Sequence, residues 1–279
     1  MIAKGPAPAT GRAPSGSTSS AGSSAGPGPP FRAVNIRAGP VTIAADLAIP
    51  ARACGVVLLA HAHGSSRHSP RNRTIAARFY NRGLAPLLLD LLTREEEAMD
   101  LQTGEWRFDV ELLAERIGAA TRWLKRQPKL GALPVLYFGG GTAAAAAIVS
   151  AAQLRDGIAA VVCFGGRADL AGESLPRVPA PTLLIAGGLD EEVIVTSKDA
   201  MTELRCEKAL RVVPGATHLF ETPAALTEAA DLAGDWFLKH LPEHLPKHLA
   251  AVRPRQSPAF LTKPLVPRHA RYRTTSTEH

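Results

Sequence analysis

Short apolar runs alternate along the chain with longer segments whose apolar residues recur at helical spacing. Near the middle, the run from Val135 to Phe138 is typical of a fully buried strand, and the alanine-rich segment from Ala143 to Ala147 is typical of a helix. Glycines at positions 139–141 separate the two, which predicts a sharp turn from strand into helix. The same patterns predict strands over residues 31–38, 41–49, 55–60, 84–92, 158–164, 181–185 and 209–213, and helices over residues 70–81, 108–127, 192–204 and 223–241.

Strands that alternate with helices at these spacings predict an α/β fold, with a mostly parallel central sheet covered by helices on both faces. The Gly39-Pro40 pair predicts a turn between the first two strands, which would form an opening hairpin. Residues 93–107, with the acidic run at 95–97, are interpreted as an exposed loop. No insertion between strands is long enough for a separate cap domain.

The predicted domain covers residues 31–241. Residues 1–30 are rich in Gly, Pro and Ser and are expected to be a disordered tail, and residues 242–279 form a second, basic tail with several prolines. The net charge of +7 lies in these tails: residues 1–30 carry two basic side chains and no acidic ones, and residues 242–279 carry seven basic and two acidic ones. The neutral remainder argues against a nucleic-acid groove built into the fold.

Three scattered cysteines suggest free thiols in a reducing compartment. The first 30 residues lack the apolar core of a secretory signal, and no apolar run approaches the roughly 20 residues that span a bilayer. We therefore expect a cytoplasmic protein with no membrane partner. The sequence leaves the oligomeric state open.

Two later signals suggest chemistry at the central turn. Asp190 follows a predicted strand, and His218 follows a short loop after the last one. A strand–turn–helix unit, then an acid, then a histidine is the chain order of the α/β-hydrolase triad, in which the carboxylate orients the imidazole. The alternative is a surface aspartate and a loop histidine that never meet.

Gly141 stands where the G-x-S-x-G pattern places the serine nucleophile. A serine there is held at positive φ under strain, and glycine reaches that conformation freely. The glycine should therefore keep the turn and remove the nucleophile. The alternative is an ordinary tight turn with no catalytic ancestry.

Backbone N–H groups near this turn are candidates for binding a negative charge. Gly140 would precede the turn and Thr142 would begin the helix. The backbone N–H of Thr142 could bind the negative charge, and Ala62 or His63 would supply a second backbone N–H. The Thr142 side chain should point away from His218, which disfavours it as a substitute nucleophile, and Cys163 is interpreted as a buried structural thiol. Although His61-Ala-His63 is typical of some metal sites, further ligands at later strand ends are missing, so we expect no metal and no other cofactor.

The chain resembles the dienelactone-hydrolase-related branch of the α/β-hydrolase family over roughly residues 33–241. The resemblance lies in the segments at 60–72, 90–97, 107–116, 165–172, 180–190 and 206–221. It implies the α/β-hydrolase fold and carries the family's acid and base to Asp190 and His218. The sequence departs where Ala62 and His63 replace the usual Gly and Ser, and where Gly141 replaces the nucleophile.

These residues predict an ester or acyl hydrolase by ancestry, with activity impaired or lost. Two other functions remain open. The chain could be a non-catalytic protein that binds a small anionic ligand, such as a carboxylate or phosphate group, at the glycine turn and helix N-terminus. It could also be an interaction platform whose tails contact a partner.

Overall fold

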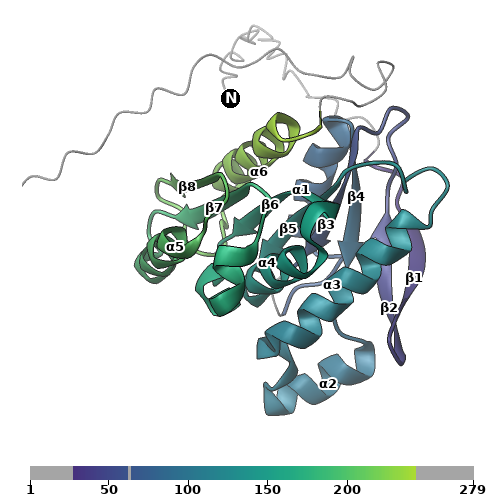
Figure 1. Cartoon of the computed structure of the whole chain (residues 1–279), viewed down its shortest axis with the longest axis horizontal. Helices are drawn as coiled ribbons and strands as arrows, with labels where there is room; N and C mark the ends of the chain where they lie inside the picture. Colours follow the sequence, from purple (N-terminus) through teal and green to yellow (C-terminus); the bar gives the residue numbers. More distant parts are fainter. Residues whose placement is uncertain (1–27, 62–63, 243–279) are drawn as a thin grey trace, which may run out of the picture.

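The computed structural model describes residues 28–61 and 64–242 (Figure 1). The predictions for the two tails therefore fall almost entirely outside the described residues. The described part is built on one eight-stranded sheet, with strand order β1-β2-β4-β3-β5-β6-β7-β8. The strands are β1 (Arg32–Ala38), β2 (Val41–Leu47), β3 (Gly55–Ala60), β4 (Leu84–Leu89), β5 (Val135–Gly140), β6 (Ile158–Phe164), β7 (Thr182–Gly187) and β8 (Lys208–Val213).

The sheet is mostly parallel, as predicted. β1 and β2 form the expected antiparallel hairpin, β2 pairs antiparallel with β4, and all other neighbouring strands are parallel. Every residue of β3, β4 and β5 is buried. Continuous apolar strands of this kind are expected where helices cover both faces of a parallel sheet.

Helices cover the two faces and create two apolar cores. Helices α1 (Pro70–Asn81) and α6 (Pro223–Lys239) pack on one face, and α3 (Val110–Lys125), α4 (Thr142–Leu154) and α5 (Glu191–Glu203) pack on the other, with α3 and α4 in front in Figure 1. Short 3-10 helices lie at η1 (Trp106–Phe108), η2 (Arg155–Gly157) and η3 (Ala168–Arg177). No helix in the described ranges is long and apolar enough to cross a membrane.

The close approach of α4 to β5 explains one glycine of the central turn. A Cβ atom at Gly139 would lie 2.5 Å from the carbonyl oxygen of Ala143 and 2.7 Å from the Cα of Ala144. Only glycine allows the helix backbone to come this close to the strand. The small alanines of α4 let the helix pack closely on the sheet and against its neighbour α3, and all of its residues from 143 to 151 are buried.

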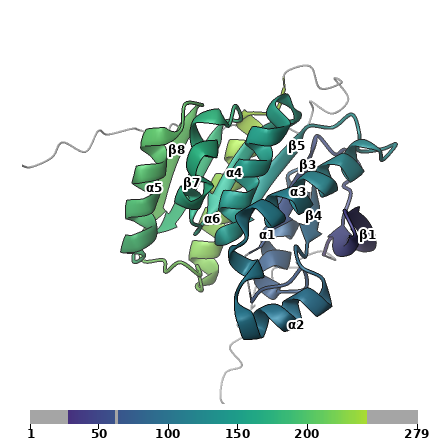
Figure 2. The ribbon, with the colours of Figure 1, turned by 60° about the horizontal axis from the view of Figure 1, so that its bottom comes forward.

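The interpretation of residues 93–107 as an exposed loop is wrong. Residues Arg94–Thr103 form helix α2, which lies below α3 at the lower edge of the domain (Figures 1 and 2). Thr93 and Glu96 form a reciprocal capping box, and acidic side chains in a first turn interact favourably with the helix dipole. Glu96 is also buried against Arg116 of α3. The acidic run therefore starts a helix.

Candidate functional site

The turn between β5 and α4 is a tight elbow centred on Gly141. Its backbone has φ 59° and ψ −133°, the positive φ at which a side chain is strained. Gly141 occupies the N-cap position of α4 and, as a glycine, has no side chain to cap the first turn of that helix. Gly140, a candidate ligand-binding residue, is the last and buried residue of β5. The elbow therefore presents backbone N–H groups and no side chain at position 141.

The loop after β6 lies against this elbow. The backbone N–H of Arg167 donates to the Gly141 carbonyl at 3.1 Å. A Cβ at Gly166 would lie 2.8 Å from the same oxygen and 2.5 Å from the Cβ of Ala144. The neighbouring Gly165 approaches the other candidate residue, because a Cβ there would lie 2.7 Å from the carbonyl oxygen of His218. Residues 165–167 thus contact the backbones of both Gly141 and His218.

The loop that carries Asp190 meets the loop that carries His218. The backbone N–H of Leu189 donates to the Ala216 carbonyl at 2.9 Å, and a Cβ at Gly187 would lie 2.4 Å from the carbonyl oxygens of Ala216 and Thr217. The loops after β5, β6, β7 and β8 therefore share one junction at the carboxyl ends of the strands. This is where ligands bind in open α/β sheets.

The side chains of Asp190 and His218 are not joined. Oδ1 of Asp190 accepts from the backbone N–H of Val193 at 3.2 Å and caps α5, whereas its Oδ2 is buried and has no hydrogen-bond partner in the part of the chain that the structure describes. The His218 side chain is exposed, and within the described residues no hydrogen bond or ion pair connects it to Asp190. The pairing of these two residues stays a prediction.

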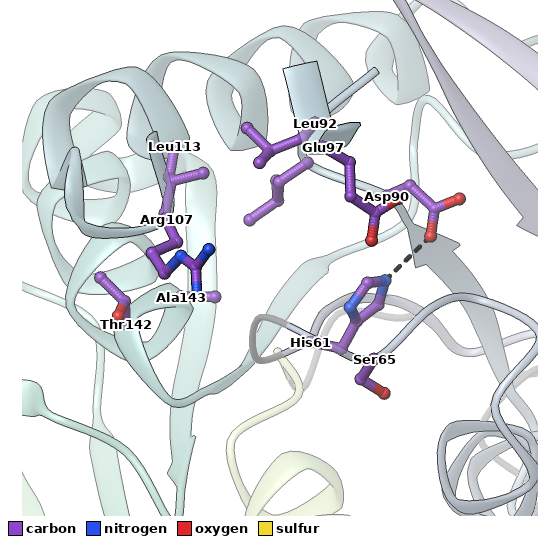
Figure 3. Close-up of a pocket in the computed structure, with 11 residues that line it drawn as sticks. His61, Ser65, Asp90, Leu92, Glu97, Arg107, Leu113, Thr142 and Ala143 are labelled. Atoms are coloured by element: carbon purple, nitrogen blue, oxygen red, sulfur yellow. Dashed lines mark hydrogen bonds and ion pairs between the residues drawn. The ribbon is translucent and has the colours of Figure 1, made fainter. Parts of the chain in front are cut away.

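A small cavity of about 50 Å³ lies beside the elbow (Figure 3). Thr142 and Ala143, at the start of α4, lie on one side of it with Arg107, and His61, Ser65 and Asp90 lie on the other. The remaining lining residues are Gly64, Leu91, Leu92, Glu97 and Leu113. The space suits a few water molecules or a small polar group.

A histidine–aspartate pair forms the far wall of this cavity. Nε2 of His61, after β3, lies 3.0 Å from Oδ1 of Asp90, after β4. Arg67 adds its backbone N–H, at 2.9 Å from the same oxygen, and its guanidinium contacts Oδ2. Burial raises the pKa of the Asp90 carboxyl, but the hydrogen bonds from His61 and Arg67 outweigh it and lower the pKa to about 2. Asp90 is therefore ionised at neutral pH.

The sequence pattern does not single out Asp90 as a site residue, because the predicted strand over residues 84–92 includes it, whereas β4 ends at Leu89. The available signal was that both His61 and Asp90 come directly after buried strands that are parallel neighbours, so their side chains meet at one edge of the sheet. Arg107 was also missed, because its segment was interpreted as a loop.

The other candidate residues are distributed as follows. Ala62 and His63, the expected oxyanion loop, lie outside the described residues. Thr142 lines the cavity. In the part of the chain that the structure describes, no group of three or more His, Cys, Asp or Glu side chains could hold a metal ion. Burial, with a smaller contribution from Cys206, raises the pKa of the Cys163 thiol to about 12, which suits an inert structural thiol.

Comparison with known proteins identifies relatives of the domain. The family model of the dienelactone hydrolase family matches residues 43–239. The crystal structure of a dienelactone hydrolase from Anabaena variabilis ATCC 29413 is 50% identical, covers 77% of this chain and 99% of that chain, and superposes with a TM-score of 0.74. Est1E from Butyrivibrio proteoclasticus, at 14% identity and a TM-score of 0.62 over 75% of this chain and 98% of its own, shares the fold.

A longer relative comes from Mycobacterium tuberculosis strain H37Rv and is named "Putative phosphoribosyl transferase Rv0571c". It is 50% identical over 215 residues, which cover 76% of this chain and 48% of that protein. A protein from strain CDC 1551 / Oshkosh, named "Putative phosphoribosyl transferase MT0597", matches with the same identity and coverage. The chain thus spans about half the length of the curated relatives it matches.

Proposed function

This chain belongs to the dienelactone hydrolase family, and from that premise we propose that it retains the frame of an ester or acyl hydrolase without its covalent nucleophile. Gly141 carries the proposal: it stands at the elbow between β5 and α4, has φ 59°, and offers no side chain to attack a carbonyl carbon. Activity by the two-step covalent route is therefore impaired or lost.

The loops around the elbow support a role for Asp190 and His218 as acid and base. Asp190 holds a buried carboxylate oxygen with no donor, which costs about 1–3 kcal/mol. The imidazole of His218, on the adjoining loop, carries an N–H group of the kind that donates to a carboxylate oxygen. We infer that its Nδ1–H turns to Asp190 when a ligand binds, which fixes the tautomer and leaves Nε2 as a base.

Residual hydrolysis would then use water in place of the missing hydroxyl. Nε2 of His218 removes a proton from the water as its oxygen bonds to the ester carbon, and the N–H of Thr142, with one from Ala62 or His63, stabilises the resulting oxyanion. The same proton returns to the alcohol as its C–O bond breaks. Enzymes that lose triad members retain roughly 10³–10⁴-fold acceleration over water, so this route is slow.

Binding without catalysis is a second candidate function. The first turn of α4, whose N-cap residue is a glycine without a side chain, lines the cavity and favours a ligand that carries a carboxylate or phosphate group. Arg107 also lines the cavity, and its guanidinium is paired with the buried Asp100. An interaction-platform role would need no such pocket. Saturable thermal stabilisation by acetate or phosphate would support binding, and its absence would favour the platform.

The name of the longer relatives describes phosphoribosyl transfer. We propose that such chemistry belongs to the part of those relatives that this chain does not span, since the shared part is the hydrolase-like domain. The three free cysteines, Cys54, Cys163 and Cys206, support a reducing compartment, and we propose that the protein is cytoplasmic.

The test is hydrolysis of a panel of aryl esters by the native chain, Gly141→Ser, Gly141→Ala and His218→Ala. We expect Gly141→Ser to exceed the native rate by at least about 100-fold, because a hydroxyl reopens the covalent route. Gly141→Ala adds the same backbone strain without a hydroxyl, so its rate of ester hydrolysis should not exceed that of the native chain. The proposal that the chain lacks its nucleophile would be contradicted if the native chain hydrolysed esters as fast as Gly141→Ser and if His218→Ala abolished that activity.

A further inference from the structure

The first turn of α1 reaches two loops of the candidate site. Asn72 is buried, and its Nδ2 donates to Oγ of Ser65 at 2.9 Å and to the carbonyl oxygen of Ser66 at 2.8 Å. These bonds hold the loop that follows β3, in which the candidate oxyanion residues lie. The preceding residue, Arg71, extends to a different part of the chain.

Arg71 binds the loop that carries His218. Its Nη1 donates to the carbonyl oxygen of Leu219 at 3.0 Å, across 148 positions of sequence. Leu219 directly follows His218, so the bond acts one residue from the imidazole. Two consecutive residues of one rigid helix therefore fix the loop after β3 and the loop after β8 relative to each other.

The rest of the His218 loop is also held in one conformation. The backbone N–H of Phe220 donates to the Thr217 carbonyl at 3.2 Å, which closes a turn around His218. Phe220 has φ 49°, a strained value for a bulky residue. Its ring is fully buried and stacks on Phe164 at a centroid distance of 4.4 Å. Strain of this kind persists only where surrounding contacts enforce it.

The contacts that hold the His218 loop act on different parts of it. Phe220 anchors the end of the loop in the core, and Gly165 leaves space for the His218 carbonyl. Arg71 is the side chain that connects this loop to α1 and, through Asn72, to the loop after β3. It therefore controls the position of the imidazole relative to the opposite side of the site.

We propose that Arg71 is a positioning residue for His218: by holding the Leu219 carbonyl, it sets where the imidazole lies relative to the loop after β3. The functional meaning of this contact rests on the proposed role of His218 as the base. A misplacement of about 1 Å in such a group can cost on the order of 100-fold in rate.

The first experiment observes His218 directly by NMR of the histidine ring Cε1–H signals in the full chain. His218→Gln identifies the signal among the nine histidines of the chain. Arg71→Met removes the donors and keeps the apolar part of the side chain, and Arg71→Lys restores one donor. The control is Arg78→Met on the same helix, whose guanidinium pairs with Asp231 at 2.6 Å.

We expect Arg71→Met to shift and broaden the His218 signal, Arg71→Lys to restore it in part, and Arg78→Met to leave it unchanged. Should Arg71→Met not fold, Arg71→Gln, whose side chain is too short to reach Leu219, replaces it. If the His218 signal of Arg71→Met, or of Arg71→Gln where that variant replaces it, is identical to the signal of the native chain, the proposal is overturned.

A second readout uses ester hydrolysis in the Gly141→Ser background. There, Arg71→Met should lower kcat by about 10-fold or more and change KM by less than about twofold, because the base is displaced and the ligand contacts remain. A proportional change in KM alone would overturn the positioning role. If Gly141→Ser hydrolyses no ester, the proposed function fails, and the NMR result still decides whether Arg71 positions His218.

Discussion

Two aspartates of this domain, Asp90 and Asp190, follow strand ends on loops that adjoin a histidine-bearing loop, and they differ in how completely their carboxylates are bonded. Asp90 receives His61 Nε2 at 3.0 Å, a backbone N–H and the guanidinium of Arg67, so both of its oxygens are occupied. Asp190 receives one backbone N–H on Oδ1, and among the described residues its buried Oδ2 has no hydrogen-bond partner. His61 is partly buried, with 9% of its side chain exposed, whereas His218 is exposed.

The difference separates a structural pair from a functional candidate. A carboxylate whose acceptor capacity is filled by charged donors stabilises the fold and has nothing left to offer a ligand. A carboxylate with a buried oxygen that receives no hydrogen bond is costly for stability but can still accept one. A histidine–aspartate contact is therefore, by itself, no evidence of a catalytic role.

Replacing each aspartate by asparagine gives the largest contrast. We expect Asp90→Asn to lower the free energy of unfolding by about 3 kcal/mol, because it removes the charge that faces Arg67 and His61 in a mostly buried site. Asp190→Asn should change it by less than about 0.5 kcal/mol, because asparagine caps a helix as well as aspartate does. Urea denaturation followed by circular dichroism measures both, and equal losses would contradict the distinction.

Acid should remove most of the Asp90 contribution. Its pKa falls from 3.8 to about 2 on folding, so the ionised carboxylate stabilises the fold above pH 3.8, and this contribution is lost as the pH falls through about 2. A shift of nearly two pKa units corresponds to about 2 kcal/mol.

Because other carboxylates also titrate in this range, the measured quantity should be the stability difference between the native chain and Asp90→Asn. We expect this difference to shrink by about 2 kcal/mol between pH 6 and pH 2 in urea titrations. A difference that stays constant over that range would show that the Asp90 pKa is not lowered in the folded chain.

The smallest expected effect concerns the histidines themselves. His61→Gln should cost about 1.5 kcal/mol, because it replaces a charge-assisted hydrogen bond in a buried site. His218→Gln changes an exposed side chain and should stay within about 0.5 kcal/mol of the native chain. Thermal unfolding at pH 7 ranks the two variants by stability. A larger loss of stability for His218→Gln than for His61→Gln would contradict the structural role of His61.

Local patterns predicted most of the fold. The apolar runs and glycine punctuation located all eight strands, and helix α1 has the predicted bounds of 70–81. The segment at 93–107 was missed because its three consecutive glutamates look solvent-exposed, and the charge that pairs with the buried Glu96 comes from Arg116, a distant residue on α3. The Thr93-x-x-Glu96 capping box was the local signal that could have identified the helix.

The candidate site was predictable in outline only. The sequence order of Gly141, Asp190 and His218 indicated which loops would meet, and those loops do share a junction. The contact of Arg71 with Leu219 joins residues that lie 148 positions apart in the chain, and no local pattern encodes such a contact. It depends on the tertiary packing of α1 and the sheet.

The backbone at Gly141 determines what a side chain there would cost. Glycine adopts φ 59° without penalty, whereas a serine held at the same φ would carry strain of about 1–3 kcal/mol. A serine at this position would therefore provide a hydroxyl at the expense of folding stability, and glycine avoids that expense.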